Sequence, residues 1–273
     1  MLGAIVGDVV GSIYEFENIK TKNFKLITET NFFTDDTVMT LAVANALMIL
    51  MAERNSEFED ENFKRAVIFD MQRLGHKYKN AGYGGKFYKW LFCTHSDGFP
   101  EPYNSLGNGS AMRVSPVAWA SDDLETVKRL ARLSAEVTHN HPEGIKGAEA
   151  TATAVFMART GAGKNEIKNY IEQNYKYDLS RRLDEIRPNY YFNETCQKTV
   201  PEAIICYLES VNFEDALRNA ISLGGDSDTL AAVTCSIAEA EYKIPDEISN
   251  LIFNKLDENL KTILKKFDEW RKI

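Results

Sequence analysis

Apolar positions along this chain recur mainly at the intervals of three and four residues that are typical of amphipathic helices. Residues 38–50, VMTLAVANALMIL, are apolar nearly all round, as expected of a helix that other helices enclose. Alternation of strand type is scarce, and neither a hairpin signal nor an internal repeat is evident. The pattern therefore predicts an all-α fold. Further helical stripes run through residues 122–137, 142–161, 230–240 and 245–270.

No linker rich in Pro, Ser or Gly divides the chain, so residues 1–273 are expected to form a single domain. Asp122, with Glu125 three residues later, predicts a capping box at the start of a helix. Residues 17–32 and 76–106 fit neither helix nor strand, and long loops in a compact domain often carry function.

The apolar opening segment, MLGAIVGDVVGSIY, predicts a core helix and no membrane span, because it is short, is interrupted by Asp8 and lacks a basic flank. Gly3, Gly7 and Gly11 recur in it every four residues. This spacing predicts a smooth helix face against which another backbone can pack closely.

Composition narrows the class of protein. Hydrophobic residues make up 44% of the chain and charged residues 26%, as in ordinary globular domains. The formal net charge of −8 argues against binding to a nucleic-acid backbone or an anionic membrane, so an anionic ligand needs a local device. The cysteines have no C-x-x-C spacing, which argues against a zinc knuckle or a disulfide framework and favours the cytoplasm; they are Cys93, Cys196, Cys206 and Cys235.

Two acidic turns, FFTDDTVMT and SLGGDSDTLAA, carry the strongest chemical signal. Either turn alone is more often a helix N-cap, whose side-chain oxygens accept hydrogen bonds from free N–H groups. Adjacent carboxylates repel each other in a partly buried place, however, and two such turns supply the hard oxygen ligands that Mg²⁺ or Mn²⁺ prefers. The predicted metal ligands are Thr34, Asp35, Asp36, Asp226, Asp228 and Thr229.

A glycine-rich segment lies between the two turns. Gly107, Asn108, Gly109 and Ser110 lead into a helical pattern, and free N–H groups at such a turn can hold a phosphate. A glycine-rich helix entry is more often only a turn, and the G-K-[ST] ending of a Walker loop is missing.

Three further polar residues are candidates for ligand contact. His139 and His141, in THNHPEG, fit contact with a ligand or a helix cap better than a transition-metal site, because no cysteine or H-E-x-x-H motif accompanies them. Glu15 follows the glycine-rich opening helix, and by itself it could be any solvated glutamate.

Taken together, these residues resemble the ADP-ribosylglycohydrolase family. The resemblance implies a compact orthogonal bundle of helices around a binuclear metal site, which agrees with the all-α pattern. It runs through nearly the whole chain in five segments: GAIVGDVVGSIYEF, FTDDTVMTLAVANAL, GNGSAMRVSPVAW, THNHPEGIKGAEATATAVFMARTG and ISLGGDSDTLAAVTCSIAEAEY.

Site roles follow from the resemblance by position. The first metal-binding motif corresponds to Thr34, Asp35 and Asp36, and the second to Asp226, Asp228 and Thr229. The catalytic set implied is Asp35, Asp36 and Glu15, the last matching a glutamate that gates the site in some relatives. Contacts with the substrate are implied for Gly107, Asn108, Gly109, Ser110 and His139.

The reaction implied is hydrolysis at ribose C1 of an ADP-ribosyl group that is joined to a protein, a nucleobase or a small molecule, with two Mg²⁺ or Mn²⁺ ions as cofactors. In this scheme the ribose hydroxyls are held, a water is oriented at C1, and a nearby carboxylate takes up its proton. The transition state resembles an oxocarbenium ion. The expected partner is an ADP-ribosylated substrate or ADP-ribose, and the motifs leave the linkage and the oligomeric state open.

Two alternatives fit part of the pattern. Other all-α, Mg²⁺-dependent diphosphate enzymes space their acids along one helix face as D-D-x-x-D, but Met39 stands here where the third acid would fall. A non-catalytic ADP-ribose-binding protein, or a toxin-blocking immunity protein of the same fold, would be favoured by loss of a metal-binding acid. None of the expected ligands is missing from the sequence, so the hydrolase is preferred.

Overall fold

The structure, a computed structural model, describes residues 1–52, 59–92 and 99–272, so Cys93 lies outside it. The described residues form helices joined by loops, with one isolated backbone bridge and no strand, which confirms the all-α prediction. The helices are α1 (Leu2–Gly11), α2 (Asp35–Ala52), α3 (Asp60–Lys77), α4 (Gly85–Phe92), α5 (Gly109–Met112), α6 (Leu124–Glu136), α7 (Pro142–Arg159), α8 (Lys164–Tyr175), α9 (Leu183–Ile186), α10 (Cys196–Leu208), α11 (Phe213–Leu223), α12 (Ser227–Glu241), α13 (Asp246–Lys255) and α14 (Glu258–Trp270), with 3₁₀ turns at Ser115–Trp119 and Arg187–Asn189.

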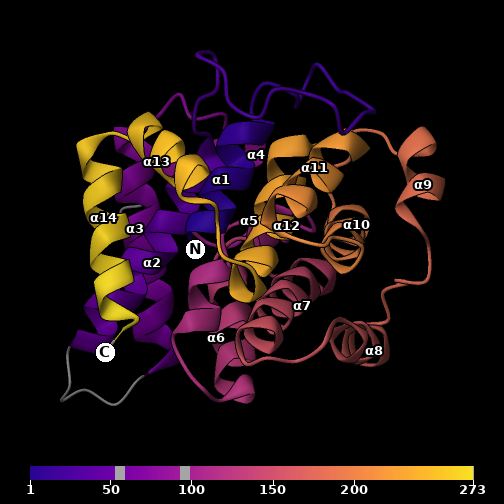
Figure 1. Ribbon diagram of the computed structural model, residues 1–273. Coiled ribbons are helices and arrows are strands. Elements are labelled where there is room, and N and C mark those ends of the chain that lie inside the picture. Colours follow the sequence, from indigo (N-terminus) through magenta and orange to yellow (C-terminus); the bar gives the residue numbers. More distant parts are fainter. Residues whose placement is uncertain (53–58, 93–98, 273) are drawn as a thin grey trace.

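Helices α1 and α12 come from opposite ends of the chain and pack along each other (Figure 1). The glycine stripe of α1 makes this contact close. A Cβ atom at Gly7 would lie 2.2 Å from the backbone oxygen of Ala231, and one at Gly11 would lie 2.4 Å from the Cα of Asp228. The predicted close approach of a second backbone is therefore confirmed, and it brings the N-terminal helix to the start of α12.

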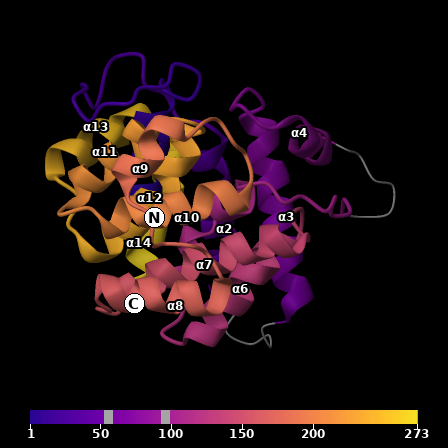
Figure 2. The ribbon, with the colours of Figure 1, turned by 90° about the vertical axis from the view of Figure 1, so that its right-hand side faces the viewer.

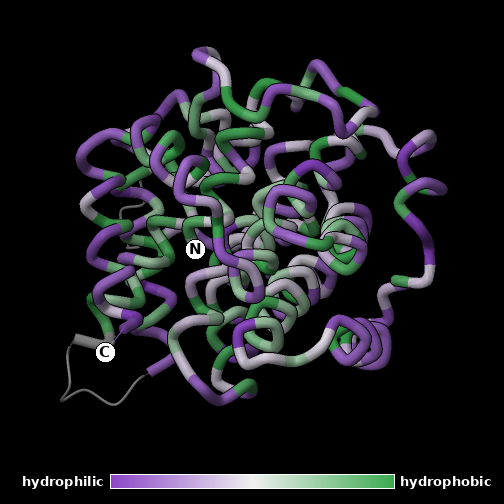
Figure 3. The backbone as a smooth tube through the Cα atoms, in the orientation of Figure 1, coloured by the Kyte–Doolittle hydropathy of each residue, from purple (hydrophilic) through white to green (hydrophobic). Residues whose placement is uncertain are grey.

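The remaining helices enclose this pair. Helix α2 is buried along most of its length and packs against α3 and α14, while α7, α10 and α11 pack against α12 (Figure 2). Apolar segments gather toward the middle of the molecule, and outer helices such as α8 and α9 are largely hydrophilic (Figure 3). This arrangement leaves the N-terminal ends of α2 and α12 near α1, where the site lies.

Two of the differences from the predicted helices are explained by N-caps. The N-cap of α6 is Asp123, which accepts a hydrogen bond from the N–H of Thr126 at 2.8 Å, so the predicted capping box at Asp122 was wrong by one residue. The single helix predicted over residues 245–270 is two helices, because Asp257 caps a new one by accepting a hydrogen bond from the N–H of Leu260 at 2.9 Å.

Several helices had no prediction. One is α4, inside the unassigned stretch of residues 76–106, whereas residues 17–32 contain no helix. Helix α10 contains Pro201 in its interior. A proline at such a position usually indicates the end of a helix, so the sequence pattern did not predict this one. Among the described helices, none combines the length and the apolar character that crossing a membrane requires.

Candidate metal centre and binding pocket

The first acidic turn is held by a buried carboxylate on α1. Asp8 accepts hydrogen bonds from the backbone N–H groups of Thr34 (3.0 Å) and Thr37 (3.1 Å) and from both threonine hydroxyls. The Thr34 hydroxyl donates its hydrogen to Asp8 at 2.7 Å. The lone pairs of the Thr34 oxygen are therefore left for another partner. Asp8 thus fixes the start of α2, the helix that carries Asp35 and Asp36.

Asp8 was not among the predicted site residues. The signal in the sequence was a single acid inside an otherwise apolar helix, and this acid served only as an argument against a membrane span. Asp8 is fully buried, and a carboxylate in that position needs several donors. The partners that explain it lie 26 and 29 residues further along the chain.

The second acidic turn depends on two glycines with positive φ. Gly224 (φ +69°) and Gly225 (φ +74°) let the chain turn sharply into α12. Asn18 holds this turn from the N-terminal loop, because its side chain accepts from the N–H of Gly225 at 2.6 Å and donates to the Gly225 oxygen at 2.9 Å. Asp226 and Asp228 follow, as the N-cap and within the first turn of α12.

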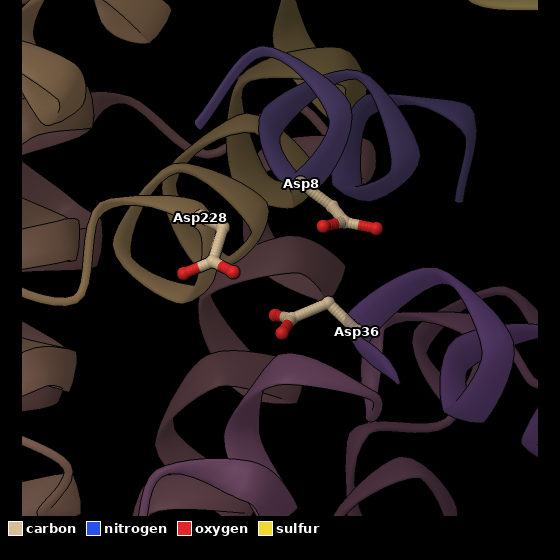
Figure 4. A group of neighbouring side chains, drawn as sticks. All are labelled: Asp8, Asp36 and Asp228. Atoms are coloured by element: carbon tan, nitrogen blue, oxygen red, sulfur yellow. The ribbon is translucent and has the colours of Figure 1, made fainter. Parts of the chain in front are cut away.

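Carboxylates from the two turns meet. Asp8, Asp36 and Asp228 point toward a common space from α1, α2 and α12 (Figure 4). Oxygens of these three residues lie within 4.8 Å of one another, and the same holds for Glu15, Asp226 and Asp228. Asp228 belongs to both groups and therefore joins them.

The residues present fit divalent cations. The Oδ1 atom of Asp36 is buried and has no hydrogen-bond partner in the described part of the chain, while its Oδ2 accepts from the Thr229 hydroxyl at 3.1 Å. No ion pair between described residues involves Asp36, Asp226 or Asp228. Uncompensated carboxylates in so buried a place are unfavourable, and an oxygen-rich, anionic cluster of this kind is the donor set that Mg²⁺ or Mn²⁺ takes.

The electrostatics of the cluster favour protons or cations. Burial, followed by repulsion from neighbouring carboxylates, raises the pKa of Asp36 and of Asp228 well above the ordinary range of aspartate. Burial raises the pKa of Asp226 to about 6. Burial, followed by the carboxylate of Asp228, raises the pKa of Glu15 to about 8. Each shift shows that negative charge is disfavoured at this place unless something positive binds.

Asp35 lies beside these clusters but in neither of them. Its side chain is half-buried and lines the same pocket, where a Cβ atom at Gly82 would lie 3.6 Å from its Oδ1. Thr34 and Thr229 also line the pocket.

A pocket of about 710 Å³ opens beside the clusters, a size typical of small-molecule binding sites. Gly107, Asn108 and Gly109 line it. The Asn108 amide donates to Oδ2 of Asp226 at 2.7 Å and so ties the glycine-rich segment to the second acidic turn. Ser110 is buried and does not line the pocket; its hydroxyl donates to the oxygen of Gly144 at 2.7 Å.

The two candidate histidines have different roles. His141 is the N-cap of α7, with its Nδ1 accepting from the N–H of Glu143 at 3.1 Å, so the prediction of a helix cap is confirmed. His139 lines the pocket and is 5% exposed. Burial and the charge of Arg113 lower the pKa of His139 well below the ordinary value, so its ring is neutral.

Known proteins resemble the chain over most of its length. A family model described as ADP-ribosylglycohydrolase matches residues 1–271. The ADP-ribosylhydrolase ARH3 of Mus musculus is 27% identical, over 89% of this chain and 82% of that protein. The ADP-ribosylarginine hydrolase Tri1 of Pseudomonas putida is 25% identical, over 89% of this chain and 70% of that protein. A solved structure described as an ADP-ribosylglycohydrolase-related protein complex has the same fold, with a TM-score of 0.69 at 21% identity over 97% of this chain and 95% of that one.

Proposed function

The chain belongs to the ADP-ribosylglycohydrolase family and is a glycohydrolase, and from this premise we propose that it uses divalent cations to hydrolyse the bond between ribose C1 of an ADP-ribosyl group and its acceptor. The observation that carries the proposal is the meeting of two carboxylate groups, joined by Asp228, beside a pocket of about 710 Å³. Buried acids that repel one another and lie in a cleft are typical of a catalytic centre.

Asp36, Asp226 and Asp228 would hold the cations, and the Thr34 and Thr229 hydroxyl oxygens lie at the same turns. When bound, Mg²⁺ or Mn²⁺ ions would supply positive charge that holds the ribose hydroxyls and lowers the pKa of an attacking water. Asp8 keeps the first turn in place through its bonds to Thr34 and Thr37.

Hydrolysis breaks the bond from C1 to the acceptor and forms a bond from C1 to the water oxygen, while one proton of the water leaves and one proton reaches the acceptor. We assign the proton transfer to Glu15, a half-buried carboxyl that belongs to the second group and whose pKa is raised to about 8. A carboxyl of this kind can take up a proton and release it within one turnover.

The rest of the substrate is assigned to the glycine-rich segment. The N–H group of Gly109 has no acceptor among the described residues and Gly109 lines the pocket, so this N–H is available to a phosphate oxygen. We assign the diphosphate to Gly107, Asn108 and Gly109, which line the pocket, and His139 to the same part of the ligand, whereas the buried Ser110 is assigned no contact.

We further propose that the acceptor is cationic, with arginine as the natural choice. The carboxylates of Glu15 and Glu194 lie near each other at the pocket, which favours a positive group. Phe16 and Phe32 line the same pocket and are 81% and 54% exposed, so they offer aromatic faces on which a guanidinium can stack. Lys86 also lines the pocket, and its charge would oppose a cation placed beside it.

The test is release of free ADP-ribose by the purified protein with Mg²⁺, with Mn²⁺ and after exhaustive chelation. Arginine-, serine- and nucleobase-linked ADP-ribose and an ADP-ribosyl acetyl ester would be compared. We expect turnover only with a divalent cation, and fastest with the arginine linkage. Turnover that survives chelation would overturn the role of the metal, and faster release from serine would overturn the cationic acceptor.

Two variants and a matched control locate the chemistry. Asp36→Asn and Asp228→Asn should each lower kcat at least about 100-fold, the scale of losing a group that acts in the transition state. Asp246→Asn, at an exposed position on α13, should keep wild-type turnover. Tight binding of ADP-ribose without release from any substrate would instead favour the binding or immunity protein.

We also propose that residues 1–273 work as one domain located in the cytoplasm. The pocket draws Glu15 from one end of the chain and Asp228 from the other, so neither half could form it alone.

A further inference from the structure

A buried arginine without a carboxylate partner lies under the glycine-rich segment. Arg113 is 0% exposed, and no ion pair between described residues includes it. Its Nη1 donates to the oxygen of Gly109 at 2.9 Å, and its Nη2 donates to the oxygen of Ser134 at 3.3 Å and to the hydroxyl of Thr138 at 2.8 Å. Burying a guanidinium on neutral acceptors is costly, so a benefit elsewhere is expected.

The contact with Thr138 has a consequence for the residue that follows it. An arginine cannot accept a hydrogen bond, so in this contact the Thr138 oxygen is the acceptor. The same hydroxyl lies 2.7 Å from Nδ1 of His139, and this nitrogen is the acceptor available to the threonine proton. If Nδ1 carried the proton instead, the threonine oxygen would face two donors and its own proton would have no partner.

The other ring nitrogen of His139 faces the pocket. Nε2 would lie 3.4 Å from a Cβ atom at Gly107 and 3.2 Å from one at Gly109, so it stands against the glycine-rich segment. Nε2 has no hydrogen-bond partner among the described residues. It is also not one of the side-chain atoms in these residues that are fully buried without a partner. A neutral histidine with an acceptor at Nδ1 presents an N–H donor at Nε2.

We propose that Arg113 and Thr138 form a relay that fixes the tautomer of His139, so that Nε2–H is held as a hydrogen-bond donor to an anionic ligand at Gly107 and Gly109. Arg113 and Thr138 are positioning residues, because neither of them needs to touch the ligand. This inference rests on the proposed function only for the identity of that ligand, the diphosphate of ADP-ribose.

The experiment uses the full chain labelled with ¹⁵N-histidine. Correlation spectra of the imidazole groups separate the Nε2–H and Nδ1–H tautomers, and His139→Gln identifies the signal among the four histidines. The matched variants are Thr138→Val, which removes the hydroxyl and keeps the shape, and Thr138→Ser, which keeps the hydroxyl. Arg113→Met removes the donor to Thr138, and the threonine pair decides the question if that variant fails to fold.

We expect the Nε2–H tautomer in the wild type and in Thr138→Ser, and a mixture of tautomers in Thr138→Val. ADP-ribose should bind Thr138→Val about tenfold more weakly, as expected when a hydrogen bond to a charged group is impaired, with KM raised and kcat retained. An Nδ1–H tautomer in the wild type, or an unchanged tautomer or affinity in Thr138→Val, overturns the relay. If the wild type does not bind ADP-ribose, the proposed function fails, and the tautomers alone decide the relay.

Discussion

The individual carboxylates at this site have different roles, which can be distinguished by the hydrogen bonds that each one accepts. Asp8 accepts four hydrogen bonds from Thr34 and Thr37, so most of its lone pairs are used. Asp36 leaves Oδ1 buried without a partner among the described residues. The hydrogen bonds of Asp8 are typical of a carboxylate that stabilises the fold, and the unpaired oxygen of Asp36 is typical of a carboxylate that binds a ligand.

Amide variants of these two aspartates should therefore affect the stability of the metal-free protein differently. Asp8→Asn places an NH₂ group against N–H and O–H donors, so we expect the free energy of unfolding to fall by about 2–3 kcal/mol. Asp36→Asn removes a charge from a repelling group, so stability should stay equal or rise by up to about 1 kcal/mol. Denaturant unfolding in the presence of a chelator measures both.

Measurements of hydrolase activity should also distinguish the two variants. Asp36→Asn should be folded and inactive, whereas any loss in Asp8→Asn should follow its loss of structure. A destabilised Asp36→Asn protein would mean that Oδ1 has a structural partner and would contradict the assignment of Asp36 as a ligand.

Local composition could predict the residues of the acidic turns but not the residues that support them. Two acids next to a threonine at a helix start are visible in a window of a few positions, as at Asp35 and Asp36. Asp8, Arg113 and Thr138 are isolated polar residues in apolar surroundings, and their meaning depends on partners between 4 and 29 residues away. A sequence pattern contains no information on which of many distant donors will face a buried acceptor.

At the scale of helices, the packing of α1 on α12 sets the geometry of the centre. α1 carries Asp8 and α12 carries Asp228, so the distance between these two helices controls the distance between two of the grouped carboxylates. The glycines of α1 keep that distance short, because a side chain there would meet backbone atoms of α12 that cannot move aside.

Gly7→Ala should consequently separate the helices. The new Cβ atom would meet the Ala231 oxygen at 2.2 Å, and we expect a loss of about 3 kcal/mol or more in the free energy of unfolding, together with weaker cation binding. The matched control is Gly163→Ala at the N-cap of α8, where nothing lies within 4 Å and φ is −69°. Thermal unfolding compares the two.

Equal unfolding temperatures for Gly7→Ala and Gly163→Ala would show that the backbones do not approach as closely as 2.2 Å implies. A Gly7→Ala protein that is as stable as the wild type but binds cations weakly would show that the substitution disturbs the carboxylate groups and not the packing of the hydrophobic core.

Helices were predictable where their apolar stripes were wide, as in α2, α7 and α12. Some helices with a narrow or interrupted stripe were missed, as α8 and α10 with Pro201, but α11 was missed although most of its residues are buried. The break between α13 and α14 was missed because the apolar period continues across it, and only the cap at Asp257 ends the first helix and starts the second. Periodicity reports burial, whereas caps and prolines decide where a helix stops.

For the molecule as a whole, folding gathers like charges from both ends of a chain that already carries a formal net charge of −8. The sequence could show that each acidic turn exists, but the meeting of residues near 8, 36 and 228 results from the entire tertiary structure. The chemistry of the two acidic turns suggested a shared set of metal ligands, and the resemblance to a known family implied the same.

This gathering of charge should make stability depend on pH and on cations together. The folded-state pKa values are raised, to about 6 for Asp226 and about 8 for Glu15, above the value near 4 of an unfolded carboxyl. Groups of this kind contribute stability that is fully present below the unfolded pKa and is lost as pH rises through the folded pKa. The metal-free protein should therefore lose stability as pH rises from about 4 to 8, with the contribution of Asp226 lost by about pH 6 and that of Glu15 by about pH 8.

Cations should reverse that trend, because they bind the ionised carboxylates and compete with protons for them. We expect the difference in Tm between Mg²⁺-loaded and chelator-treated protein to widen steadily from pH 6 to pH 8, and Mn²⁺ to behave alike. Asp228→Asn, which removes the carboxylate common to both groups, should flatten the difference at every pH, whereas Asp246→Asn on the surface of α13 should leave it as in the wild type. A difference in Tm that stays constant or narrows as pH rises would mean that the gathered carboxylates are not the groups that bind the cations.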